Sequence, residues 1–115
     1  GEAEIAVEAA RCIFHLCNVS APIEIKDIFR SARGIMMLSD ALMAGGDQLQ
    51  EWIVRALDAL MRGSPDNRIA VRESGGLVAM SSILEGGGDA PEERGTLLAT
   101  VCSAMEAAMT AEHVE

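Results

Sequence analysis

The sequence predicts an all-α protein made of stacked helical repeats, and three observations support this prediction. Half of the 115 residues are hydrophobic, yet only 3% are aromatic and none is tyrosine. A core must therefore be filled by Ala, Leu, Ile, Val and Met, which are mostly helix formers. No stretch alternates apolar and polar residues for long enough to indicate a sheet. Finally, similar segments recur about every 42 residues, as in repeat proteins.

The repeat is visible in segments that keep nearly one spacing. RGIMML at 33–38 returns 42 residues later as GGLVAM at 75–80, and each copy runs on into a glycine-rich break. LCNV at 16–19 matches LDAL at 57–60 at a spacing of 41. Ordered matches of this kind are not expected from composition alone. The chain is therefore predicted to be a single unit of stacked repeats.

Three helices are expected before the first glycine-rich break. Apolar residues within 3–19 recur at i, i+3, i+4 and i+7, as on one face of an amphipathic helix, and Ser-Ala-Pro then ends this helix. A shorter helix is expected at 23–32, ended by Gly34. A third is expected at 35–43, where the glycines at 45–46 supply a left-handed cap.

The second period repeats this order with four further helices, which makes seven. We expect Asp47 to cap the first of them, and Asp66 or Asn67 to cap the second. Pro91 and Glu92 suit the first turn of the last helix. The four helices are expected at 48–62, 68–73, 77–84 and, after the glycines at 86–88, at 92–111.

The charge balance narrows the classes of partner. The formal net charge is −9, which disfavours nucleic acid because duplex binding depends on neutralising phosphates. Anionic membranes are disfavoured for the same reason. The apolar runs are far shorter than the ~20 residues needed to span a bilayer. We expect a soluble protein that binds neither nucleic acid nor membrane.

The three cysteines indicate a reducing compartment. Cys12, Cys17 and Cys102 are an odd number within apolar helical patterns, which does not suit a disulfide framework and places the protein in the cytoplasm or nucleus. Cys12 and His15 share a helical face, but a structural zinc site needs four ligands. We therefore expect core cysteines, with no metal and no cofactor. The seven methionines are likewise interpreted as core filler.

Two segments resemble armadillo repeats. The stretch at 67–80 resembles the junction between the first and second helices of such a repeat, and Leu-Cys-Asn-Val at 16–19 resembles the Leu-Ser-Asn-Leu signature of its third helix. The resemblance divides the chain into a third helix at 1–20 and two repeats at 21–63 and 64–115. It implies a right-handed superhelical solenoid whose third helices line a groove for peptides or partner helices. HEAT repeats, or a plain closed bundle, are the structural alternatives.

The resemblance also implies where a ligand would bind. Asn18 matches the groove asparagine that bonds a ligand backbone, and Phe14 takes the place of a tryptophan found in importin-alpha-type repeats. The next repeat departs from the pattern, with Ala59 and Arg55 at the corresponding positions. A regular asparagine ladder is thus missing, which argues against binding of nuclear-import signals.

Helical spacing predicts a groove face with three arginines. One hypothesis is that these arginines grip acidic side chains of a ligand. The other is that they pair with the neighbouring Glu8, Glu51 and Asp58 as a solvated surface. Trp52 is either a groove hot spot or a core residue. The predicted face consists of Arg11, Phe14, Asn18, Trp52, Arg55, Ala59 and Arg62.

No residue pattern indicates catalysis, and no catalytic residue is assigned. We therefore expect a non-catalytic scaffold or adaptor that binds a protein or peptide, with acidic side chains, through the third-helix groove or the ends of the stack. A stack that starts with a lone third helix leaves one apolar flank uncovered, and the neighbour expected there is the rest of its own chain, a second copy in a homo-oligomer, or another subunit of a larger assembly. The alternative function is a regulatory or substrate-recruiting domain of a larger enzyme.

Overall fold

Seven helices account for the secondary structure of the computed structural model, which describes residues 2–18, 22–86 and 95–109, without the side chains of residues 2, 3 and 86. The described part of the chain contains no strand, so the all-α prediction and the number of helices are confirmed. The helices are α1 (Glu2–Leu16), α2 (Ile23–Ser31), α3 (Gly34–Ala44), α4 (Asp47–Met61), α5 (Pro65–Glu73), α6 (Gly76–Gly86) and α7 (Gly95–Met109).

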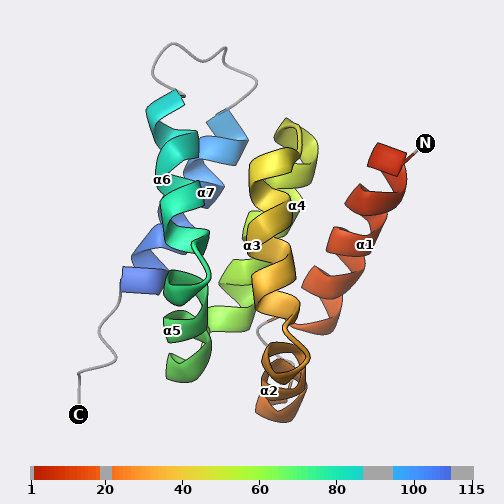
Figure 1. Ribbon diagram of the computed structural model, residues 1–115, viewed down its shortest axis with the longest axis vertical. Helices are drawn as coiled ribbons and strands as arrows, with labels where there is room; N and C mark the ends of the chain where they lie inside the picture. The colour runs from red at the N-terminus through yellow and green to blue at the C-terminus, as the bar shows by residue number, and fades with distance from the viewer. Residues whose placement is uncertain (1, 19–21, 87–94, 110–115) are drawn as a thin grey trace.

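Helices that are equivalent in the repeat pack on one another (Figure 1). The long helix α4 lies in the middle, with α1 and α7 on either side of it. In the same way α3 packs against α6, and α2 against α5. The packing therefore follows the order of the repeats, as expected for a stack in which each unit buries the apolar face of the next.

The core is centred on α4. This helix contacts α1, α3, α5 and α7, so its apolar residues are covered from several directions. The buried positions form one broad apolar face, and the charged residues Glu51, Arg55 and Asp58 share the opposite side of the helix. The residues of α4 that are at most 1% exposed are Ile53, Val54, Ala56, Leu57, Leu60 and Met61.

The turn between α2 and α3 is made by a residue other than glycine. Arg33 has φ 66°, in the left-handed region, and Gly75 between α5 and α6 has φ 87°. The two residues are 42 positions apart, so both repeats use the same sharp turn. The expectation that Gly34 stops the helix is wrong, because Gly34 already belongs to α3. A Cβ there would lie 2.3 Å from the ring of Phe29, so glycine permits a close approach of the two helices.

Several predicted helix ends are wrong by a few residues. α5 begins at Pro65 and not at 68, because Ser64 is its N-cap and its side chain accepts the Asn67 N–H at 3.2 Å. α4 has Gly46 at its N-cap, and Asp47 lies in its first turn. Gly45 has φ −93° and ψ 165°, so the cap of α3 is extended and not left-handed.

The outer helices differ from their predicted bounds as well. α1 ends at Leu16, short of the predicted end at 19, where the Cys17 N–H donates to the carbonyl of Ile13 at 3.0 Å. The described part of the last helix begins at Gly95. The predicted start of that helix at 92, its end at 111, and the roles of Pro91 and Glu92 lie outside the described residues.

Candidate partner-binding surface

An aromatic cluster forms where α1 packs on α4. Trp52 of α4 is half-buried, and its ring centroid lies 5.8 Å from that of Phe14 of α1 in an edge-on arrangement of 61°. The ring of His15 lies 6.3 Å from that of Trp52. Edge-on ring pairs at such distances are favourable, because the positive edge of one ring faces the negative face of the other.

Two arginines complete this cluster. The guanidinium carbon of Arg55 lies 4.9 Å from the Trp52 ring centroid, and that of Arg11 lies 5.5 Å from it. Both distances are within the range of cation–π attraction. Four of the predicted groove residues therefore come together, and we name Arg11, Phe14, Trp52 and Arg55 the α1–α4 surface.

Each predicted groove arginine also pairs with a carboxylate on its own helix. Arg11 and Glu8 are joined at 2.8 Å, Arg55 and Glu51 at 2.6 Å, and Arg62 and Asp58 at 2.9 Å. The three pairs with Glu8, Glu51 and Asp58 that the second hypothesis named are therefore present. Pairs spaced three or four residues apart on a partly exposed helix are weak, at about 0.3–0.5 kcal/mol each.

The other three predicted groove residues lie apart from this cluster. Asn18 follows the end of α1, so it does not continue the helical face of Phe14 as expected. Ala59 is only 3% exposed and belongs to the core. Arg62 is the C-cap of α4 and borders a separate cavity of about 620 Å³ that Ser103 of α7 also lines. The predicted register is therefore right in the middle of α1 and α4 and wrong at their C-terminal ends.

An apolar cavity of about 370 Å³ lies where α1 meets α3. Its twelve lining residues come from the first four helices and from Ala32, the C-cap of α2, and all of them are apolar or glycine. We name this cavity the apolar groove. The sequence predicted an uncovered flank at this end of the stack, but not these residues. The lining includes Ala9 and Ile13 of α1, Phe29 of α2, and Met37, Leu38 and Ala41 of α3.

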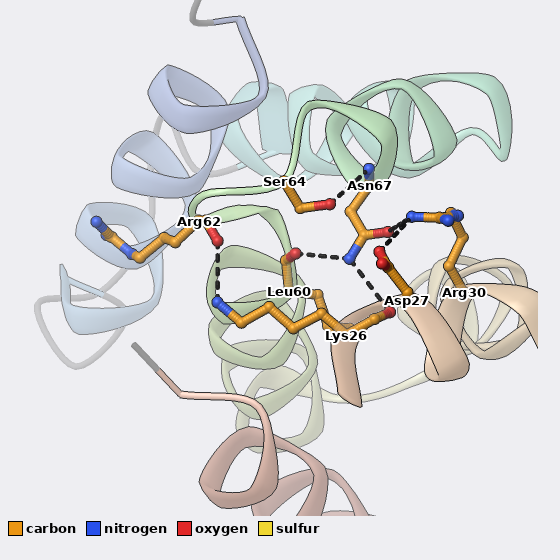
Figure 2. A network of polar contacts seen from close by, with 7 residues as sticks. All are labelled: Lys26, Asp27, Arg30, Leu60, Arg62, Ser64 and Asn67. Atoms are coloured by element: carbon orange, nitrogen blue, oxygen red, sulfur yellow. Dashed lines mark hydrogen bonds and ion pairs between the residues drawn. The ribbon is translucent and has the colours of Figure 1, made fainter. Parts of the chain in front are cut away.

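A buried polar network that sequence analysis did not identify joins α2, α4 and α5 (Figure 2). Asn67 is fully buried, and its Oδ1 accepts from Nη1 of Arg30 at 2.7 Å. Its Nδ2 donates to the carbonyl of Leu60 at 2.8 Å and to that of Lys26 at 3.4 Å. The only signal in the sequence was the Ser-Pro-Asp-Asn turn, which indicated a cap.

Lys26 extends the same network to the end of α4. It is 3% exposed, and its Nζ donates to the carbonyl of Arg62 at 2.9 Å. The carbonyls at a helix C-terminus lack partners within the helix and carry partial negative charge, so an ammonium group is favourable there. The network (Figure 2) thus ties α2 to the C-terminal end of the central helix.

The cysteines and methionines are less buried than predicted. Cys17 is buried, but Cys12 and Cys102 are exposed, so the expectation of three core cysteines is wrong for two of them. Burial raises the pKa of the Cys17 thiol, and the nearby Lys26 opposes this shift. Several methionines lie at the surface because the helix faces that carry them are uncovered. Met36, Met37, Met43 and Met109 are between 41% and 65% exposed.

The described residues offer neither a metal site nor a membrane-spanning helix. Among the side chains that the structure describes, no group of three or more His, Cys, Asp and Glu is placed to hold a metal ion. Within residues 2–18, 22–86 and 95–109, no helix combines the length and apolar character needed to cross a membrane. The chain matches no protein-family model, and comparisons with curated proteins and with solved structures find no match.

Proposed function

We propose that this chain is a non-catalytic protein-interaction module of the armadillo type that binds a peptide or partner helix on the α1–α4 surface. The observation that carries the proposal is the position of Trp52, whose ring has guanidinium groups 4.9 and 5.5 Å away. A half-buried tryptophan held between arginines offers a large, rigid contact area with charged donors beside it. Tryptophan and arginine are the residues enriched at binding hot spots.

The armadillo assignment rests on the repeated three-helix order. Two successive units place a short helix, a left-handed turn, a medium helix and a long helix in that order. The turn residues Arg33 and Gly75 are 42 positions apart, and the equivalent helices of the two units pack on each other. These features support a solenoid over a closed bundle, since a solenoid stacks each element on its counterpart.

The chemistry of the surface favours a ligand with acidic side chains. A ligand carboxylate can replace Glu8 beside Arg11, or Glu51 beside Arg55, because these intrahelical ion pairs are weak. The ligand contact gains from the Trp52 ring beside it, which excludes water from one side of each guanidinium group. Arginine also presents a planar fork that fits a carboxylate with two hydrogen bonds.

The experiment measures binding of a peptide in which glutamate alternates with leucine, beside an otherwise identical lysine peptide. Trp52 is the only tryptophan, so its fluorescence reports binding at this surface in the unmodified protein. Calorimetry then compares Arg55→Glu with Arg33→Glu, which changes charge equally at an exposed residue of the α2–α3 turn. We expect Arg55→Glu to weaken binding roughly 10- to 100-fold and Arg33→Glu to have little effect.

Trp52→Ala provides a second arm of the experiment. It removes the contact area without changing charge, and we expect a loss of at least about 10-fold in affinity. Melting temperatures of all variants show whether each protein is folded. Equal losses for Arg55→Glu and Arg33→Glu would show that only net charge matters. Preference for the lysine peptide, or unchanged binding by Trp52→Ala, would refute the proposal.

A further inference from the structure

The two medium helices, α3 and α6, occupy equivalent positions but are covered differently. α6 covers the side of α3 that faces the second repeat, and α3 covers the side of α6 that faces the first repeat. α3 has no such counterpart on its own outer side among the described residues, and there the apolar groove opens. Residues 42 positions apart can therefore be compared to find which side chains a preceding helix covers.

The side of α6 covered by α3 is equivalent to the apolar groove. Ala79 is 1% exposed, whereas its equivalent Met37, which lines the groove, is 64% exposed. Ile83 is buried, and its equivalent Ala41 is half-buried at the groove wall. α3 and α6 each pack with the other two helices of their own repeat. Among the described residues, only α6 also has the medium helix of a preceding repeat beside it, so that helix accounts for the lower exposure of Ala79 and Ile83. The apolar groove thus occupies the position on α3 that corresponds to the side of α6 covered by α3.

The face of α3 that carries Ser39, which lies beside Ser74 and Gly76 of the second repeat, has a counterpart on α6. Ile35, Ser39 and Leu42 are at most 3% exposed, and their spacing of i, i+4 and i+7 puts them on one helix face. Ser39 contacts the second repeat, because its Oγ lies 2.8 Å from that of Ser74. The equivalent residues on α6 are Leu77, Ser81 and Leu84, which repeat the same large, small, large pattern and are only half-buried.

We propose that a second copy of this chain fills the apolar groove, in a head-to-tail stack that places the Leu77–Ser81–Leu84 face of α6 of one copy on α1 and α3 of the next. The contact between two copies then has the same arrangement as the packing of α3 on α6 within one copy. The chain carries both halves of this contact at opposite ends. Such an interface joins two different faces, so it leaves one groove and one α6 face open and allows further copies to add. The proposal does not depend on the α1–α4 surface.

The test is the molar mass in solution as a function of concentration. The mass of one chain is 12.1 kDa. We expect the average molar mass measured by sedimentation equilibrium to rise at least about two-fold above this value as the protein concentration increases. Met37→Glu places a charge in the groove, and Leu84→Glu places one on the α6 face. Each variant alone should stay monomeric at every concentration. Met37 is largely exposed, so its replacement should leave the fold intact.

Mixing the two variants separates this proposal from other modes of association. The Met37→Glu copy keeps its α6 face and the Leu84→Glu copy keeps its groove, so an equal mixture should form dimers and stop there. Circular dichroism checks folding, and Ser81→Glu replaces Leu84→Glu if the latter unfolds. A monomeric wild type, self-association of either variant at wild-type strength, or a mixture that stays monomeric would overturn the proposal. A wild type that stays monomeric while binding an added helical peptide would also overturn it.

Discussion

Replacing Asn67 by leucine should destabilise the fold more than any exposed substitution, because the polar network loses its centre. Leucine has the same branched shape but is larger, and it cannot donate to the carbonyl of Leu60, which lies in the last turn of α4 and has no partner within that helix. A buried carbonyl without a partner costs about 1–3 kcal/mol. The lost bond from Arg30, whose side chain is 28% exposed, adds about 1 kcal/mol after allowance for solvent screening.

The expected loss is therefore about 2–4 kcal/mol in the free energy of unfolding. Urea denaturation of wild type and Asn67→Leu measures it, provided that the m-value is unchanged. Asp66→Ala serves as a control at the neighbouring exposed residue and should change stability by no more than about 0.5 kcal/mol. A double-mutant cycle with Arg30→Met isolates the bond between these two side chains. A loss below about 1 kcal/mol for Asn67→Leu would refute the reasoning.

Three further predictions concern the α2–α3 turn and the cysteines. Arg33→Gly should stabilise the protein by about 1 kcal/mol because it removes the strain of a left-handed arginine, and Gly75→Arg should destabilise it by a similar amount, as measured in thermal melts. A destabilised Arg33→Gly or a stabilised Gly75→Arg would contradict the shared turn. Iodoacetamide should modify Cys12 and Cys102 quickly and Cys17 slowly, as read by mass spectrometry, and equal rates would contradict its burial. Since burial raises the pKa of Cys17, its neutral thiol contributes stability that is complete below about pH 8.5 and is lost as pH rises through the folded pKa. Wild type should thus lose more stability than Cys17→Ala above about pH 9, which urea titrations at several pH values would check.

The sequence predicted the elements that depend on local pattern. Helix number and order followed from apolar periodicity and from the repeated segments at 33–38 and 75–80, and the structure has both. The grouping of Phe14, Trp52 and Arg55 was also predictable, because positions three and four apart share a helix face and the long helices pack side by side. Local periodicity and one repeat length were sufficient for these features.

Features that depend on contacts between distant helices were not predictable. The sequence indicates only that Asp66 or Asn67 caps a helix, because it does not show that Arg30 and Leu60 lie beside Asn67. Cys12 and Cys102 sit in apolar patterns, yet no neighbouring helix among the described residues covers them. In a stack, the same residue type is buried in the middle and exposed at the ends. Periodicity identifies the apolar side of a helix but not whether a neighbour covers it.

The central position of α4 has a consequence for cooperativity. Long repeat proteins can lose stability one unit at a time, because each unit contacts only its neighbours. Here one helix packs against members of every unit, since it contacts α1, α3, α5 and α7. Melting α4 would expose the apolar faces of all these helices at once. Partial unfolding from one end is therefore disfavoured, and the chain should lose its structure in a single transition, as small globular domains do.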